Sequence, residues 1–240
     1  MGQKVHPLGF RLGITQKHQS YWCTHPRLSS IWIQDASFLR NIISTTYNGA
    51  GITNIEIQRR DFGSPSITIE IQAARPAAFV GRETQTLDHL RDELIKKLSA
   101  FYRRRNLPDP GKIQLNLHVK PVSNPDIHAA ILAERLVEDL QQRKPYRRAM
   151  RQTVQKAVKA GVKGIKVQIS GRLNGADIAR AENVREGPVP LQTLRADIEY
   201  DSRSAKTIYG LLGIKIWVFH GEKLKPITHR KNTIESNSSQ

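Results

Sequence analysis

Three arginine side chains, Arg147, Arg148 and Arg151, lie close together within a stretch, residues 140–176, that has ten basic residues and no Asp or Glu. A guanidinium group donates paired hydrogen bonds whose geometry matches the oxygen atoms of a phosphate. Lys156, Lys159 and Arg172 of the same stretch are further candidates for contacts with phosphate. The chemistry indicated is binding of a phosphate polymer, with RNA favoured. The alternative is an ordinary solvated helix face on a basic protein.

The spacing of apolar residues predicts the helix that positions these cations, with Pro145 at its first position and Gly161 after its end. Its apolar face consists of Tyr146, Ala149, Met150, Thr153, Val154, Ala157 and Val158. A helix selected only for stability carries acidic residues in its first turn, because the helix dipole is positive there. The arginines oppose that dipole, which favours a helix that faces a polyanion.

The composition supports a nucleic-acid partner. The chain has 240 residues, with 38 Lys and Arg against 21 Asp and Glu, a formal charge of +17 and an isoelectric point near 10.3. Such a positive field attracts phosphate polymers. No 18-residue apolar run exists, so we expect no membrane partner. The single cysteine, Cys23, excludes an intramolecular disulfide and a multi-cysteine zinc site.

No catalytic motif is recognisable. The chain has neither a G-x-x-x-x-G-K-[ST] phosphate-binding loop nor an H-E-x-x-H pair of zinc ligands. We therefore expect a protein that is not an enzyme and has no catalytic residue, cofactor or metal ion.

Gly and Pro residues punctuate residues 1–34, which we expect to be an irregular basic N-terminal arm whose Lys4 and Arg11 are candidate RNA contacts. Asp35 is expected to cap a helix that ends near Tyr47. The next elements expected are two antiparallel strands at 53–60 and 66–73, a helix that ends near residue 102, a third strand at 112–120 and a helix starting at 124–125. We assign residues 35–142, including this last helix, to the first domain.

Residues 143–222 are predicted to form a second domain with the arginine-bearing helix on an antiparallel sheet. The alternating segments are 165–169, 176–184, 191–200 and 208–219. Residues 223–240 are polar and are predicted to be a disordered tail. The fold class predicted for the whole chain is α+β.

The order of elements over residues 35–120 resembles the K-homology RNA-binding module of the second topological type. That resemblance implies a three-stranded sheet with helices on one face. The module clamps nucleotide phosphates with a G-x-x-G loop, and this chain has Gly81-Arg82-Glu83-Thr84 instead. Arg82 is a candidate RNA contact, but Glu83 and Thr84 depart from the pattern, so we expect the loop to add little affinity.

Several segments resemble the bacterial and plastid small-subunit ribosomal protein family that is third in the traditional numbering. They are MGQKVHP at residues 1–7, GFRLG at 9–13, YRRAM at 146–150, GIKV at 164–167, SGRLNGA at 170–176, LRADI at 194–198 and YG at 209–210. The sequences at residues 12–16 and 207–210 more closely resemble those of the cyanobacterial and plastid branch. Asn183 and Pro188 depart from the aromatic and basic residues usual in the family.

The resemblance implies a structural constituent of the small-subunit head that binds ribosomal RNA and neighbouring ribosomal proteins. It also implies contact with mRNA along the channel by which mRNA enters, through Arg147, Arg148 and Arg151. We expect a location in the ribosomes of the plastid stroma, with the bacterial cytoplasm as the alternative, and no homo-oligomer. The competing hypotheses are a free K-homology RNA-binding regulator, disfavoured by the altered loop, and an RNA-processing enzyme, disfavoured by the missing motifs.

Overall fold

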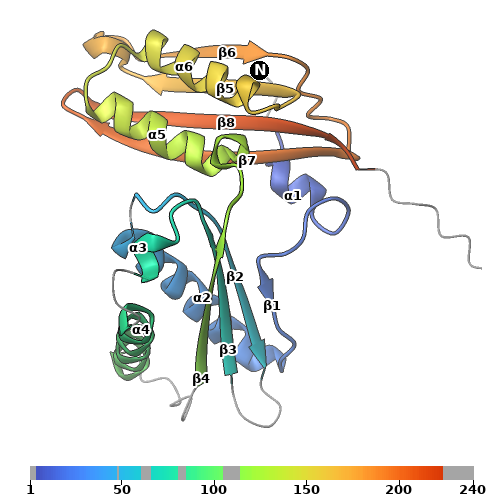
Figure 1. Ribbon diagram of the computed structural model, residues 1–240, viewed down its shortest axis with the longest axis vertical. Coiled ribbons are helices and arrows are strands. Elements are labelled where there is room, and N and C mark those ends of the chain that lie inside the picture. Colours follow the sequence, from blue (N-terminus) through green and yellow to red (C-terminus); the bar gives the residue numbers. More distant parts are fainter. Residues whose placement is uncertain (1–3, 48, 61–65, 81–84, 105–113, 224–240) are drawn as a thin grey trace, which may run out of the picture.

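The computed structural model describes residues 4–47, 49–60, 66–80, 85–104 and 114–223. Within these ranges the chain is a mixed α+β structure with two separate sheets, each covered by its own helices (Figure 1). The turn at 61–65, the loop Gly81–Thr84 with Arg82, and the tail from residue 224 lie outside the described residues. No helix in the described ranges is long and apolar enough to cross a membrane.

The first sheet has four strands in the order β1-β2-β3-β4. Their bounds are Ser20–Tyr21 for β1, Ile52–Arg60 for β2, Ser66–Ala73 for β3 and Gln114–Pro121 for β4. The antiparallel pairing of β2 with β3 confirms the prediction, and β3 pairs with β4 in parallel. Three helices lie in the same part of the chain as this sheet: α2 (Pro26–Thr46), α3 (Ala77–Val80) and α4 (Gln85–Arg104).

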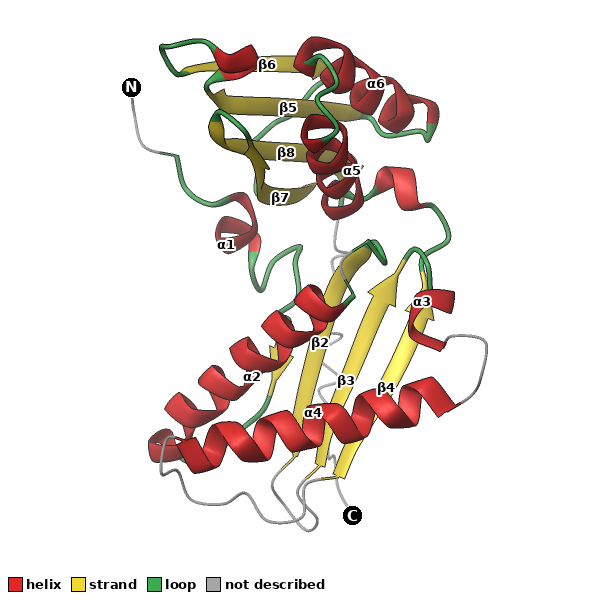
Figure 2. Cartoon of the chain, turned by 90° about the vertical axis from the view of Figure 1, so that its left-hand side faces the viewer, coloured by secondary structure: helices red, strands yellow, loops and turns green. Residues whose placement is uncertain are grey.

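Helices α2 and α4 lie against one face of this sheet (Figure 2). Alternation in β3 turns Ile67, Ile69 and Ile71 toward the helices, and all three are buried. Leu39 of α2 and Leu94 of α4 are buried in the same core. The apolar residues that follow helical spacing in α2 and α4 therefore pack against those that alternate along β3, in one apolar layer.

Two expectations for the N-terminal part are corrected. The helix expected to start at Asp35 begins at Pro26, because Asp35 is a buried partner of Arg59 inside α2 rather than a cap. The arm is not irregular throughout, since α1 spans Pro7–Arg11 and β1 pairs in parallel with β2. The sheet expected to have three strands consequently has four.

The second sheet is antiparallel in every pairing, with the order β6-β5-β8-β7. Its strands are β5 (Gly164–Gly171), β6 (Arg180–Glu186), β7 (Ala196–Thr207) and β8 (Gly210–Glu222). A single helical turn, η2 (Leu173–Gly175), connects β5 to β6. Helix α6 (Tyr146–Lys159) lies on this sheet, which confirms the predicted helix on an antiparallel sheet.

Helix α5 (Ala129–Gln141) is the main correction to the expected organisation. We assigned this helix to the first domain, but Leu132, Leu136 and Leu140 are buried in the core of the second sheet beside α6 (Figure 1). It also starts later than expected, because residues Pro125–Ile127 form a separate 3-10 turn, η1, and His128 occupies the position before α5. The apolar stripe of α5 was recognisable, but its packing partner was not.

Candidate nucleic-acid interface

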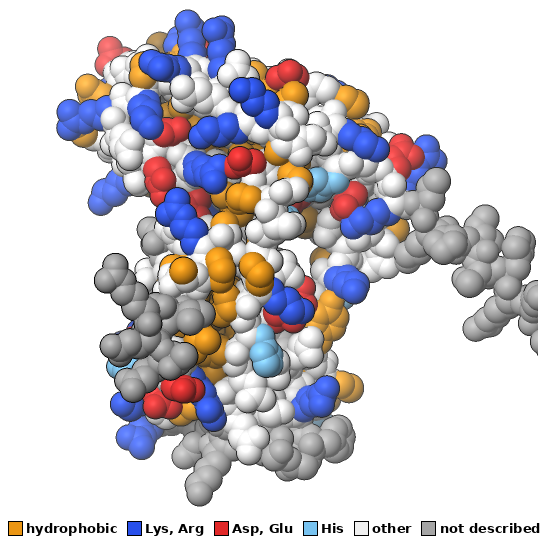
Figure 3. Space-filling view, viewed as in Figure 1, with side chains coloured by type: hydrophobic (Ala, Val, Ile, Leu, Met, Phe, Trp, Pro, Cys, Tyr) orange, Lys and Arg blue, Asp and Glu red, His pale blue; other side chains and the backbone are white. Residues whose placement is uncertain are grey.

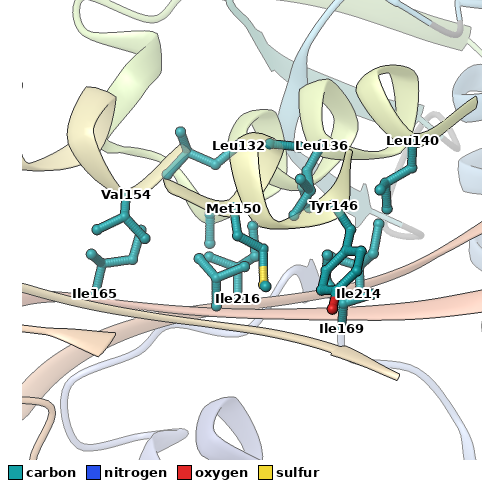
Figure 4. Close-up of a cluster of buried hydrophobic side chains, with 14 of the residues drawn as sticks. Leu132, Leu136, Leu140, Tyr146, Met150, Val154, Ile165, Ile169, Ile214 and Ile216 are labelled. Carbon is teal, nitrogen blue, oxygen red and sulfur yellow. The ribbon is translucent and has the colours of Figure 1, made fainter. Parts of the chain in front are cut away.

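The apolar side of α6 fixes how the helix is rotated on the sheet. Figure 4 shows Val154 above Ile165, Met150 beside Ile216, and Tyr146 close to Ile169. These six side chains belong to one buried cluster, and none of the six is more than 3% exposed. Because one side of α6 is held in this cluster, the opposite side must face solvent.

Arg147, Arg148 and Arg151 are exposed on that opposite side. Residues three and four positions apart are neighbours on a helix surface, so Arg151 lies next to both of the others. We call these three residues the α6 arginine patch. Figure 3 views the molecule from the side of α5 and α6, and Lys and Arg side chains are spread over this upper part.

A network of polar contacts anchors one member of the patch. The Tyr146 hydroxyl donates to Glu182 Oε1 at 2.8 Å, and Arg147 Nε donates to the Tyr146 oxygen at 3.1 Å. Arg147 Nε also lies 3.6 Å from Glu182 Oε2. Arg180 joins from β6, with its Nη2 3.2 Å from the Tyr146 oxygen. The first turn of α6 is thereby connected to strand β6.

These contacts perturb the ionisable groups in consistent directions. The hydrogen bond from Tyr146 lowers the pKa of Glu182 against the opposing effect of burial, and Arg147 and Arg180 lower it further. The hydrogen bonds to Tyr146 and Glu182 raise the pKa of Arg147. Both groups are therefore charged at neutral pH, and Glu182 offsets part of the positive charge of Arg147.

The other two members of the patch differ from Arg147. Within the described residues, Arg148 and Arg151 make no ion pair or hydrogen bond with another side chain. Two guanidinium groups near the start of α6 thus face solvent without a carboxylate partner in this part of the chain. Such groups can donate to phosphate oxygens without first breaking a protein contact.

The remaining predicted contacts fall in separate places. Arg172 lies at the same end of the second sheet as the patch, where Nε donates to the Ala176 carbonyl at 2.9 Å. Lys156 and Lys159 lie at the opposite end of α6 and border a hollow of about 350 Å³ that Asp126 also lines. Lys4 is exposed in the arm, and Arg82 lies outside the described residues.

The prediction that Arg11 contacts RNA is wrong for this conformation. Arg11 is 0% exposed, and its guanidinium nitrogens donate to five backbone carbonyls. The acceptors are Pro7, Pro190, Leu191, Thr193 and Ala196. These bonds hold α1 against the segment that leads into β7, so Arg11 stabilises the fold. Nothing in the sequence around Arg11, which lies between Gly9 and Gly13, indicated that its side chain would be buried.

Two residues near the patch were missed in the sequence. Glu182 and Arg180 lie beyond the acid-free stretch, and only the β5–β6 hairpin brings them to Tyr146. Strand alternation places Glu182 on the helix-bearing face, but no spacing rule connects that strand position with the start of α6. No group of three or more His, Cys, Asp or Glu side chains in the described ranges is arranged to hold a metal ion.

Comparison with known proteins identifies the family. Residues 136–218 match the family described as ribosomal protein S3, C-terminal domain. The small ribosomal subunit protein uS3c of Chlorella vulgaris is 68% identical over 229 residues, which cover 95% of this chain and 99% of that protein. The uS3 protein of Synechocystis is 46% identical over 222 residues, which cover 92% and 87% of the two chains. The chain therefore belongs to the uS3 family of small ribosomal subunit proteins.

Proposed function

We propose that this chain, a structural constituent of the small ribosomal subunit, lies in the subunit head and holds mRNA as it enters. Its family is one of structural ribosomal proteins, and ribosomal RNA and neighbouring ribosomal proteins are its partners. The finer role toward mRNA is supported by the α6 arginine patch. The similarity to plastid and cyanobacterial relatives supports ribosomes of a plastid as its location.

The single observation that carries the mRNA role is the exposure of Arg148 and Arg151 at the start of a helix whose other side is buried. A rigid helix fixes where the cations point, and contacts from these cations to phosphates carry no sequence information. A site that must accept every message as it moves should bind the backbone and ignore the bases. We infer that the patch grips incoming single-stranded mRNA and helps to hold strands of structured messages apart.

The element order α2-β2-β3-α3-α4-β4 supports a K-homology domain of the second type in the first half of the chain. The limits expected from the sequence were residues 35–142. We now propose a domain that begins near residue 26, where α2 starts, and ends before α5, because α5 packs with the second sheet. The residues proposed to contact RNA are Lys4, Arg82, Arg147, Arg148, Arg151, Lys156, Lys159 and Arg172.

The test replaces Arg147, Arg148 and Arg151 with Ala in ribosomes that carry the variant protein. None of the three is in the core, so the protein should fold and assemble. Translation of messages with a hairpin downstream of the start should slow more than translation of unstructured messages. A matched control replaces Lys96, Arg103 and Arg104 of α4, which removes the same charge from an exposed surface elsewhere.

Equal slowing of both kinds of message, or the same result with the α4 control, would contradict the proposal. Failure of the patch variant to assemble would assign the patch to ribosomal RNA docking instead. Three contacts to single-stranded RNA should also contribute about −2 to the slope of log affinity against log salt, at about −0.7 for each phosphate. Loss of this contribution in the variant gives a second readout.

A further inference from the structure

The second sheet has a face turned away from α5 and α6 (Figure 1). Helix α1 contacts β7, and the buried Trp217 and Phe219 pack with Val189 at one end of this face. Strand register places its side chains in rows that cross all four strands. One row runs Arg185, Lys166, Trp217 and Tyr200, from β6 through β5 and β8 to β7. The arm reaches this end of the face, since the His6 ring meets Tyr200 edge to face at 4.9 Å.

The next row is polar and carries a further cation. It runs Asn183, Gln168, Lys215 and Ser202, of which Asn183, Lys215 and Ser202 are exposed. Amide and hydroxyl side chains of this kind are frequent donors to phosphate and sugar oxygens of nucleic acids. This row therefore combines positive charge with hydrogen-bond donors on a rigid surface.

The third row contains only small residues: Ala181, Ser170, Gly213 and Ser204. A Cβ atom at Gly213 would lie 3.0 Å from Ser170 Oγ, so the neighbouring strands are closely packed at this point. A partner can approach the backbone closely here without displacing large side chains. The three rows together are called the open sheet face below.

No carboxylate occurs in these rows, all of which lie in the described part of the chain. The acidic residues of the same strands point the other way. Glu182 and Glu186 alternate with Asn183 and Arg185 on β6, and Glu199 and Asp201 alternate with Tyr200 and Ser202 on β7. Strand alternation thus keeps these acids off the open sheet face, while the helix-bearing side carries both acids and the arginines Arg180 and Arg203.

The cations on this face are crowded at a cost to the free protein. Lys166 Nζ lies 5.0 Å from the centre of the Trp217 ring. Burial lowers the pKa of Lys166, and the nearby charges of Lys4 and Arg185 lower it further. Like charges directly opposite each other on neighbouring strands are destabilising. A bound polyanion would remove this repulsion.

We propose that the open sheet face docks the phosphate backbone of the small-subunit ribosomal RNA. Protein interfaces are depleted in Lys, Ser and Ala and enriched in aromatic residues at their centres, which is the reverse of the second and third rows. The face lies on the side of the sheet away from α6, so a strand of mRNA held by the arginine patch does not also cover it. The proposal rests on the ribosomal role but not on the mRNA role.

The first experiment uses the purified full chain with Lys166, Arg185 and Lys215 changed together to Gln. Binding to protein-free small-subunit ribosomal RNA is measured over a range of salt concentrations. Each lost phosphate contact should reduce the magnitude of the salt slope by about 0.7 to 0.9, the values for single strands and for B-form DNA, so the triple variant should lose about 2 to 3. The control is Lys96, Arg103 and Arg104 of α4 changed together to Gln, which removes the same charge.

A slope change no larger than that of the α4 control would overturn the proposal. If binding to naked RNA is unchanged but the variant is lost from assembled subunits, the face docks a protein instead. A second variant, Ser204→Glu, places one negative charge in the exposed third row and leaves the core intact. It should weaken RNA binding without lowering the thermal midpoint, and unchanged binding would also count against the proposal.

The outcome is separable from that of the α6 arginine patch. The open-face variant should alter binding to ribosomal RNA and incorporation into subunits. The patch variant should incorporate normally, slow the translation of structured messages and reduce the salt slope for single-stranded RNA. Failure of either proposal thus leaves the other with its own readout.

Discussion

The carboxylate of Asp35 lies 2.9 Å from Arg59 Nη1, and this ion pair joins helix α2 to strand β2 inside the first core. The two side chains are only 2% and 9% exposed. The Tyr102 hydroxyl of α4 also donates to Asp35, and the Arg59 guanidinium lies 4.1 Å from the centre of the Trp32 ring. One carboxylate therefore connects both covering helices to the sheet.

Asp35→Asn should lower the free energy of unfolding by about 3 kcal/mol or more, because it leaves the Arg59 charge buried without its partner. Chemical unfolding in urea measures this change. Tyr102→Phe removes a single hydrogen bond from the same site and should cost less, about 1–2 kcal/mol. Burial and the bond to Asp35 raise the pKa of Tyr102 to about 12, so its hydroxyl remains a donor throughout the neutral range. Equal losses for the two variants would contradict the central position of Asp35.

Arg11→Lys should destabilise the protein while leaving its affinity for RNA nearly unchanged. A lysine ammonium cannot reach the five carbonyls that the guanidinium now satisfies, so buried acceptors lose their donors. We expect a loss of about 2–4 kcal/mol in urea unfolding. Arg11→Gln, which removes the charge as well, should retain the salt slope for RNA binding, whereas a smaller slope with normal stability would restore the phosphate contact first expected.

Sequence periodicity predicted most elements of this chain and the burial of their apolar faces. The isoleucines of β3 and the apolar side of α6 lie where alternation and helical spacing put them. Apart from the packing partner of α5, the failures occur where a polar residue is buried by distant partners. In the sequence, Asp35 resembles a helix cap and Arg11 resembles a surface cation. In the fold, Arg59 is the buried partner of Asp35, and the segment before β7 supplies the acceptors of Arg11.

The candidate site shows the same limit. The rotation of α6 was predictable, so the exposure of Arg147, Arg148 and Arg151 was also predictable. The partner of Arg147 was not, because Glu182 reaches it only through strand pairing across the β5–β6 hairpin. Sorting of charges between the faces of the second sheet likewise depends on register, which is a property of four strands together rather than of one segment.

A half-buried carboxylate between two histidines should make stability depend on pH. Glu199 Oε2 lies 3.2 Å from His128 Nδ1 and 3.3 Å from His220 Nε2. The hydrogen bond to Glu199 raises the pKa of His128 despite partial burial. Burial alone would raise the pKa of Glu199, but the hydrogen bonds and charges of the two histidines outweigh it and lower that pKa.

The two shifts define a pH window. The stabilisation from His128 is complete below its ordinary value of 6.5 and is lost as pH rises through its raised pKa. The stabilisation from Glu199 is complete above its ordinary value of 4.5 and is lost as pH falls through its lowered pKa. Glu199→Gln should therefore destabilise more near pH 5.5 than near pH 8 in urea unfolding. A difference that does not vary with pH would show that these charges do not interact.

Glu182 is the one carboxylate paired with the α6 arginine patch in the described part of the chain, and its removal should strengthen RNA binding. Glu182→Gln retains an amide oxygen that can accept from the Tyr146 hydroxyl, so the link between α6 and β6 should persist. Arg147 then loses its charged partner and becomes available to a phosphate.

We expect tighter binding to single-stranded RNA and a salt slope larger in magnitude by about 0.7, which corresponds to one added phosphate contact. The matched control is Glu186→Gln on the same strand, which removes the same charge from an exposed position that pairs with Ile165 near the far end of α6. Net charge alone would make the two variants equal, whereas a local effect raises the slope only for Glu182→Gln. Weaker binding by Glu182→Gln would mean that the carboxylate instead orients Arg147 toward RNA, and Arg147→Ala should then reproduce that loss.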